Sequence, residues 1–293
     1  MTATRTGGSV AALRRVADEA AVAASVEVRE IDTPDECARA CELVCEVWLT
    51  AAAEAPVQAS MLRALAHSGG YVVGAYDWAG TLVGVCVGFF GHDVTAGMHS
   101  HLAAVSPRAQ TRGVGRALKL HQRAWAAERG VPTIGWTFDP LVRRNAVFNL
   151  GRLGATAVSY LPDFYGAMSD GVNAGQGSDR LLLHWDVSLP APVPSDAGAA
   201  PAGGGAAAEP VEGSVPSVLA VGDAGEPVPR EAGAGAVAVT VGLPRDIEAL
   251  RRRDPGLGRA WRQAVRAAVH PRLELGWRIT GVTAAGAYVL QAG

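Results

Sequence analysis

The sequence predicts a protein of the α/β (α+β) class, and two observations support this. Valine-rich runs with strand-like alternation are interspersed with helical stretches, which is typical of a sheet with helices on its faces. Hydrophobic residues make up 49% of the 293 residues and charged residues 18%, so a sizeable core can be buried. The main predicted elements are, in chain order, a strand at 26–31, helices at 34–48 and from Pro56 to near Gly69, strands at 71–77, 81–91 and 98–105, a helix at 113–129, a strand at 133–138, a helix at 144–153, and strands at 155–160 and 180–187.

Local signals predict where these elements begin and end. Thr33 is a capping residue and Pro34 occupies the first helical position, so a helix starts there. A turn signal at 77–80 divides the apolar region into two hairpin strands, which explains it better than one membrane-spanning helix does. Gly130 and Pro132 end the long helix that begins at 113.

Composition predicts four segments of different character. Residues 1–24 form a flexible or helical leader, and residues 25–188 form the main domain. Residues 189–217 are rich in proline, alanine, glycine and serine, which predicts a disordered linker. Residues 218–293 form a small α/β appendage that we expect to dock on the main domain, because so small a core is marginal alone. Its predicted elements are strands at 218–221 and 236–241, helices at 244–252 and 255–269, and strands at 277–282 and 287–291.

Charge and cysteine content narrow the classes of partner and compartment. A net charge of −2 gives no field for nucleic acid or an anionic membrane, and we expect neither partner. No export signal and no disulfide framework are evident, so a cytoplasmic location is expected. Cys37, Cys41 and Cys45 share one helical face, where packing is the simpler interpretation. Three ligands in a line cannot supply tetrahedral coordination alone, so no metal is expected.

The most informative segment runs from Val105 to Gly115. A strand ends at Val105, and a Gln-x-x-Gly-x-Gly turn then opens the long helix. The first amides of a helix lack partners and carry the positive end of the macrodipole, and glycines let the backbone close around an anion. This arrangement predicts a diphosphate cradle. The third glycine of the dinucleotide-binding fingerprint and the Gly-Lys-Ser/Thr of the P-loop are both missing from it.

The pattern Val-x-Pro-x-x-Gln-x-x-Gly-x-Gly resembles the acyl-CoA-binding motif of the GCN5-related N-acetyltransferase (GNAT) superfamily. The resemblance implies a GNAT-type, mostly antiparallel central sheet, with the backbone near Val105 pairing with pantetheine. It also implies that the pyrophosphate is held by Arg116 together with the backbone amides of the loop, which are those of Gln110, Thr111, Arg112, Gly113, Val114 and Gly115. The segment from Trp136 to Ala155 is similar to an acetyltransferase-like subgroup, some of whose members are linked to N-succinylation of amino acids. Acetyl-CoA, succinyl-CoA or another acyl-CoA is therefore the expected donor.

The family resemblance also suggests which residues move protons. Some members place a glutamate base six residues before the end of the strand, a position that His99 occupies here, and His101 shares its parity if the strand is regular. The tyrosine that often acts as general acid is replaced by Leu150. Tyr165 is an alternative hydroxyl. Asn145 and Asn149 either contact the donor or make turn hydrogen bonds.

Two further regions bear on specificity. The loop at 161–179, ending in Asp179-Arg180, is expected to shape the acceptor pocket, with disorder as the alternative. The appendage is rich in arginine, and we expect a solvated face with Trp261 packed inward, or else guanidiniums that bind a carboxylate of the acyl group or acceptor. The arginines concerned are Arg251, Arg252, Arg253, Arg259, Arg262 and Arg266.

The predicted function is transfer of an acyl group from acyl-CoA to a small primary amine, plausibly an amino acid. Two alternatives remain open: a non-catalytic acyl-CoA-binding module, which the missing tyrosine permits, and acylation of a protein lysine or N-terminus. A homodimer is also left open.

Overall fold

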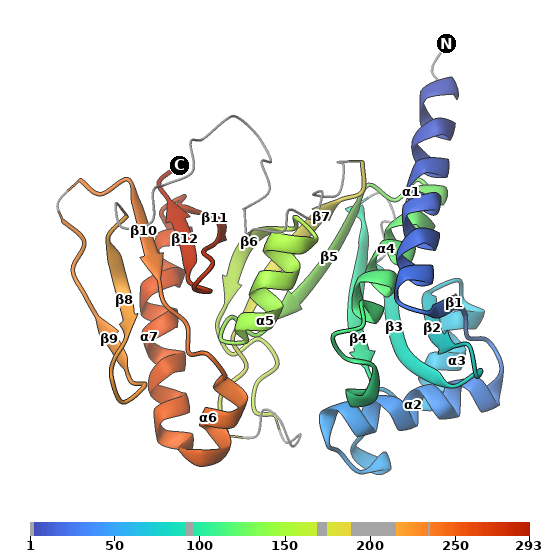
Figure 1. Ribbon diagram of the computed structural model, residues 1–293, viewed down its shortest axis with the longest axis horizontal. Coiled ribbons are helices and arrows are strands. Elements are labelled where there is room, and N and C mark those ends of the chain that lie inside the picture. The colour runs from blue at the N-terminus through green and yellow to red at the C-terminus, as the bar shows by residue number, and fades with distance from the viewer. Residues whose placement is uncertain (1–2, 92–95, 169–174, 189–214, 234) are drawn as a thin grey trace. The chain divides into compact units, whose positions relative to one another are not determined.

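The computed structural model describes residues 3–91, 96–168, 175–188, 215–233 and 235–293 (Figure 1). These residues form two compact units: the first contains the chain up to Trp136 with residues 186–188, and the second contains the rest. Most of the predicted linker at 189–217, namely residues 189–214, lies outside the described residues, as do residues 169–174 of the predicted loop. None of the described helices is long and apolar enough to cross a membrane.

The first unit is built on a five-strand array in the order β1-β2-β3-β4-β5. Adjacent strands from β1 to β4 are antiparallel, and β4 pairs with β5 in parallel. The mixed, mostly antiparallel sheet that the sequence predicted is therefore confirmed. The strands are β1 (Val26–Glu30), β2 (Tyr71–Asp77), β3 (Leu82–Phe90), β4 (Met98–Val105) and β5 (Thr133–Phe138), whose last two residues belong to the second unit.

The helices of the first unit begin and end close to the predicted positions. They are α1 (Ala3–Ala23), α2 (Pro34–Trp48), α3 (Ala59–His67) and α4 (Val114–Glu128), with short 3-10 turns η1 (Ala52–Glu54) and η3 (Pro107–Ala109). The Thr33 hydroxyl accepts the amide of Glu36 at 3.3 Å, which confirms the predicted cap. In the leader, α1 is held to α4 by the Arg14–Glu128 ion pair at 2.6 Å.

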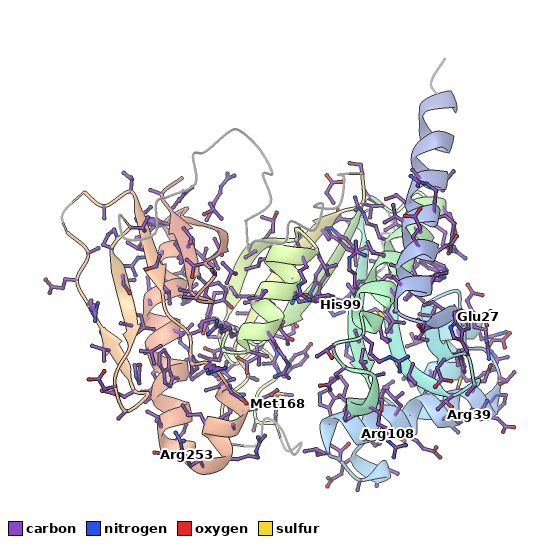
Figure 2. All side chains as sticks on the ribbon, viewed as in Figure 1. Glu27, Arg39, His99, Arg108, Met168 and Arg253 are labelled. Carbon is purple, nitrogen blue, oxygen red and sulfur yellow. The ribbon has the colours of Figure 1, made fainter. Side chains whose placement is uncertain are left out.

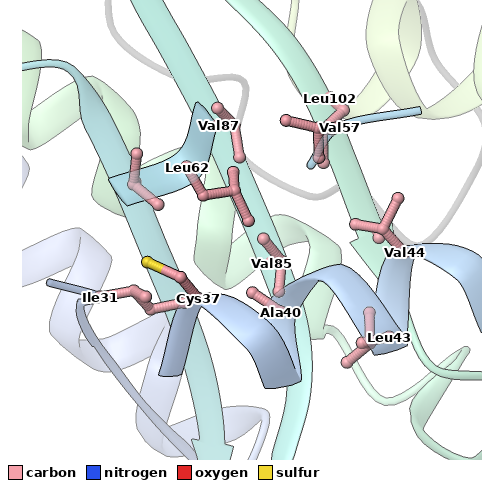
Figure 3. Close-up of a cluster of buried hydrophobic side chains, with 12 residues drawn as sticks. Ile31, Cys37, Ala40, Leu43, Val44, Val57, Leu62, Val85, Val87 and Leu102 are labelled. Atoms are coloured by element: carbon pink, nitrogen blue, oxygen red, sulfur yellow. The ribbon is translucent and has the colours of Figure 1, made fainter. Parts of the chain in front are cut away.

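The core of the first unit lies between α2, α3 and the sheet (Figure 3). Apolar side chains of α2 meet those of β3 and β4, and α3 contributes Leu62, which is fully buried. Cys37 belongs to this cluster and is 1% exposed, so it is used as a small apolar side chain. This core fixes β4, the strand that leads into the predicted cradle.

The second unit combines the end of the main domain with the appendage. Its helical segment starts as α5 (Arg143–Ala146) and widens into a π-helix at Val147–Arg152, where a regular helix at 144–153 was predicted. The antiparallel pair β6 (Thr156–Leu161) and β7 (Arg180–Asp186) follows. A second sheet has the order β11-β12-β10-β8-β9, with strands β8 (Ser217–Val221), β9 (Pro227–Pro229), β10 (Ala238–Val241), β11 (Arg278–Val282) and β12 (Tyr288–Gln291).

Two helices of the appendage, α6 (Ile247–Arg253) and α7 (Pro255–Glu274), join it to the residues before it in this unit. Trp261 is fully buried, as predicted, and its indole donates to the Gly225 carbonyl at 2.8 Å. The Tyr288 hydroxyl donates to the carbonyl of Pro140 at 2.7 Å. The appendage is therefore packed against the segment that follows β5.

The expectation of a solvated arginine face is only half right. Arg252, Arg253 and Arg259 are exposed, and Figure 2 labels Arg253 on α6. Arg251 and Arg262 are instead buried, because both guanidiniums bind the carboxylate of Asp139 at 2.8 Å. Their carboxylate partner comes from the chain itself, 112 and 123 residues away.

Candidate functional site

Strand β4 carries a β-bulge at the position of the candidate base. Val87 of β3 pairs with Leu102 and the next residue, Gly88, pairs with Ser100, so His101 has no partner in the ladder with β3. A bulge bends the strand and redirects side chains, and bulges are common beside active sites. The alternation along β4 is nevertheless kept, because Met98, Ser100 and Leu102 are buried whereas His99 and His101 are less buried, so the two histidines share a face as the parity argument expected.

The two imidazoles lie close to each other beside this bulge. The rings of His99 and His101 lie 6.1 Å apart, and both contact Phe89, at 5.3 and 5.7 Å between ring centres. His99, labelled in Figure 2, is partly buried, whereas His101 is exposed. The structure thus brings together the two histidines that the sequence singled out.

The surroundings of both histidines favour the neutral imidazole. Burial lowers the pKa of His99 below its ordinary value, and the nearby His101 and Lys119 lower it further. Burial also lowers the pKa of His101. A neutral imidazole holds a lone pair that can accept a proton, so either ring is in the protonation state that a general base requires.

The segment after β4 has the geometry of an anion cradle. The 3-10 turn η3 follows the strand, and Thr111 and Gly113 then adopt left-handed conformations with φ of 67° and 90°. Helix α4 begins at Val114, and no described side chain caps it. Its first-turn amides are therefore free to donate to an anion, as predicted for Val114, Gly115 and Arg116.

The surroundings of the cradle fit an acyl-CoA. A Cβ at Gly115 would meet only Val105, at 3.8 Å, so the protein leaves room beside this amide. Among the described residues, Arg108, Arg112 and Arg116 form no ion pair and can face phosphates. Gln110 lies over the strand end, with its amide nitrogen 3.5 Å from the Val105 carbonyl oxygen.

The edge of β4 also fits a pantetheine chain. In the described part of the chain, β4 pairs with β5 only through Met98 with Ile134 and His99 with Gly135. The strand continues to Val105, so the remainder of this edge has no strand partner within the first unit. Extended amide-bearing ligands add to such edges by backbone hydrogen bonds.

Lys119 was not among the candidates predicted from the sequence, and the structure places it behind β4. Its ammonium is buried and donates to the Ser100 hydroxyl at 3.0 Å and to Gln122 at 2.7 Å, while lying 3.9 Å from the Trp136 ring centre. Burial lowers the pKa of Lys119 to about 8. The available signal was that Lys119 is the single lysine of the chain.

The remaining candidates lie in the second unit. The Tyr165 hydroxyl is 3.3 Å from that of Thr137, and Tyr165 is 43% exposed. Asn149 is buried and Asn145 is half-buried, and the change from α- to π-helix between them breaks the regular four-residue spacing that the sequence argument used. Leu150, which replaces the family tyrosine, is 4% exposed and has no proton to give.

Asp179 anchors the described end of the predicted acceptor loop. Its carboxylate accepts from the Tyr160 hydroxyl at 2.6 Å and from Arg266 at 2.8 Å, and hydrogen bonding to Arg266 helps to hold its pKa below the usual range despite burial. Arg180 donates to the backbone carbonyl of Asp179 instead of its carboxylate. The predicted Asp179–Arg180 anchor thus works through Arg266.

Comparison with known proteins agrees with this geometry. Residues 28–151 match the model of the acetyltransferase (GNAT) family. No curated protein has a matching sequence. Among solved structures, yncA from Salmonella typhimurium, determined with its cofactor acetyl-CoA, is 18% identical with a TM-score of 0.45, over 58% of this chain and 98% of that one.

Two other solved structures show a likeness of the same size. The phosphinothricin acetyltransferase of Sinorhizobium meliloti, in complex with acetyl-CoA, is 16% identical with a TM-score of 0.46, over 55% of this chain and 88% of that one. The ribosomal-protein-S18-alanine N-acetyltransferase of Escherichia coli is 14% identical with a TM-score of 0.44, over 56% of this chain and 96% of that one.

The uncapped helix start after β4, together with the family match, defines an acyl-CoA-dependent N-acetyltransferase. Residues 28–151 therefore form an acetyltransferase domain of the GNAT kind. Its general reaction is acyl transfer from acyl-CoA.

Proposed function

We propose that the protein transfers an acetyl or succinyl group from acyl-CoA to the amine of a small molecule, with an amino acid as the acceptor class. The observation that carries the catalytic part is the bulge in β4, which presents His99 and His101 in neutral form beside Phe89. An ammonium must lose a proton before its nitrogen can attack a thioester, and a neutral base on this strand can accept that proton.

Each element of the first unit has a role in this proposal. The amides at the start of α4 hold the donor's diphosphate, and Arg108, Arg112 and Arg116 add positive charge around it. The open edge of β4 up to Val105 pairs with the pantetheine amides. Fixing the thioester beside the base supplies much of the rate enhancement, because positioning converts a bimolecular encounter into an intramolecular step.

His99 takes the proton of the acceptor amine, directly or through water. As the amine nitrogen bonds to the acyl carbon, the carbon–sulfur bond breaks and the leaving thiolate needs a proton. Tyr165 is the candidate donor, supported by its partly exposed hydroxyl near Thr137. Asn145 and Asn149 are retained as candidate donor contacts.

The test is release of free CoA thiol. The full-length protein is incubated with acetyl-CoA or succinyl-CoA and a panel of amino acids, other small amines and peptides with free N-termini. Thiol release with one or more amino acids supports the proposal. Release only with peptides would replace the acceptor class with a protein, and binding of donor without release across the panel would favour the non-catalytic module, which the buried Leu150 makes the second candidate.

A further inference from the structure

A second concentration of arginines lies in the second unit, away from the charges already assigned. A hollow of about 270 Å³ is lined by Val147 and Phe148 together with Arg143, Arg144, Arg152 and Arg245. Five of the lining residues come from the segment that contains α5 and the π-helix, and Arg245 precedes α6 of the appendage. The hollow therefore exists only because the appendage packs on this segment.

The charges around the hollow do not cancel. Arg144 already has a carboxylate partner, because its two terminal guanidinium nitrogens donate to the two carboxylate oxygens of Glu248 on α6, the second of them at 2.6 Å. Asp246 also acts on Arg144, and its carboxylate caps α6 by accepting from Ala249 at 2.9 Å. Four arginines against these two carboxylates leave an excess of two positive charges.

Three of the arginines have no carboxylate partner among the described residues: Arg143, Arg152 and Arg245. Arg143 is positioned by the turn between β11 and β12, where a Cβ on Gly286 would lie 1.9 Å from its Nε atom. The Arg143 side chain therefore passes close to this turn. Guanidiniums that converge without a protein anion are suited to phosphate, which they bind through charge-assisted hydrogen bonds.

The floor of the hollow is apolar. Val147 and Phe148 are both half-buried, and both lie at the start of the π-helix, a distortion that is often found at functional sites. An aromatic ring beside arginines is the combination that binds nucleotides, because the base stacks while the cations hold the phosphate. A volume of about 270 Å³ is near the lower end for ligand sites, which suits one phosphorylated nucleoside.

We propose that this hollow binds a phosphorylated nucleoside, with its phosphate on Arg152 and Arg245 and its base on Phe148. The occupant is a free nucleotide, for which AMP serves as the probe. This site is distinct from the diphosphate cradle at the start of α4, because it uses other residues in the other unit.

The proposal is tested by calorimetric titration of the full-length protein with AMP, inorganic phosphate, CoA and dephospho-CoA. The variant Arg152→Gln/Arg245→Gln is compared with Arg230→Gln/Arg259→Gln, which removes the same charge from exposed arginines outside the hollow. The first variant is expected to weaken binding about tenfold or more, since a hydrogen bond to a charged group is lost at each position, and the second to bind like the parent.

Weaker AMP binding in the first variant, with AMP binding unchanged in the second, supports the proposal. CoA and dephospho-CoA show whether donor binding is left intact. Phe148→Ala is expected to weaken AMP binding about tenfold while leaving inorganic phosphate unaffected. Equal AMP affinity in the parent and the first variant, or no AMP binding by the parent, overturns the proposal. Because binding is measured directly, this outcome is independent of whether the acyl-transfer assay succeeds.

Discussion

Arginines near the start of α4 and arginines on α6 and α7 have opposite environments. Around the α4 start, Arg112 and Arg116 have no carboxylate partner among the residues that the structure describes, and no described side chain caps the helix amides beside them. On α6 and α7, Arg251 and Arg262 are buried on Asp139. The same residue type is therefore available for ligand binding in one unit and has a structural role in the other, and what differs is whether the chain supplies the anion.

The largest effect on the free energy of unfolding is expected from removing the carboxylate that pairs with the buried arginines. Asp139→Asn leaves Arg251 and Arg262 buried without a counter-charge, which costs about 3–5 kcal/mol of unfolding free energy. Urea unfolding followed by circular dichroism measures this loss. Glu248→Gln, which removes the partner of the more exposed Arg144, is the matched control and should cost at most about 1 kcal/mol. Equal costs for the two variants would contradict the structural role of Asp139.

The same carboxylate predicts a pH dependence. Its two arginines hold the pKa of Asp139 well below the usual range in the folded protein, although burial alone would raise it. A carboxyl with a depressed folded pKa stabilises the fold above its unfolded pKa, near 4, and loses that contribution as the pH falls through the folded value. The urea concentration at the midpoint of unfolding should therefore decrease as the pH falls below about 4 in the parent, and it should decrease less in Asp139→Asn.

Removal of the candidate base should have the next largest effect. His99→Ala is expected to lower kcat by about 10²–10⁴ with little change in donor affinity. The parent's kcat/KM should fall on the acid side with an apparent pKa below 6.5, because burial and nearby charge favour neutral His99. His101→Ala tests the second imidazole, and His270→Gln, on α7, is the control. Full activity in both His99→Ala and His101→Ala would rule out this pair as the base.

A smaller effect is expected from filling the cradle. Gly115→Val places branched methyls beside the amide where the protein leaves room near Val105, and should raise the KM for acyl-CoA about tenfold or more while changing stability little. Gly115→Ala is the milder companion, because its single Cβ is accommodated. If valine left the KM unchanged, the diphosphate would have to lie elsewhere.

The smallest effect is expected from the exposed arginines of the cradle. Arg112→Gln should weaken CoA binding several-fold at low salt and hardly at all at high salt, because an exposed charge is screened. Titrations at two ionic strengths measure this, with Arg259→Gln as the control. A salt-independent loss would indicate that Arg112 acts by packing and not by charge.

Sequence reasoning succeeded where the determinants are local. The cap at Thr33, the turn at 77–80 and the glycines before α4 each act through neighbours a few residues away, so the strand and helix order of the first unit was predictable. It did less well at 143–152, where the helix widens after its first turn. A π-helix depends on packing against other elements, which residue spacing does not reveal.

The candidate site divides in the same way. The cradle was predicted because its glycines, its strand end and its helix start are contiguous. The bulge at His101, the buried Lys119 and the burial of Arg251 and Arg262 were not, because each depends on a strand register or a partner distant in sequence.

The sequence by itself determined the fold class, the boundaries of most elements and the position of the candidate acyl-CoA loop, since hydrophobic periodicity and turn chemistry are properties of short segments. The tertiary structure alone decided which charged side chains form ion pairs with one another. It assigned Arg251 and Arg262 to Asp139, and it gave Arg112 and Arg116 no carboxylate partner within the described part of the chain. It also lowered the pKa of His99 and Lys119, because desolvation exists only once the chain has closed around a group.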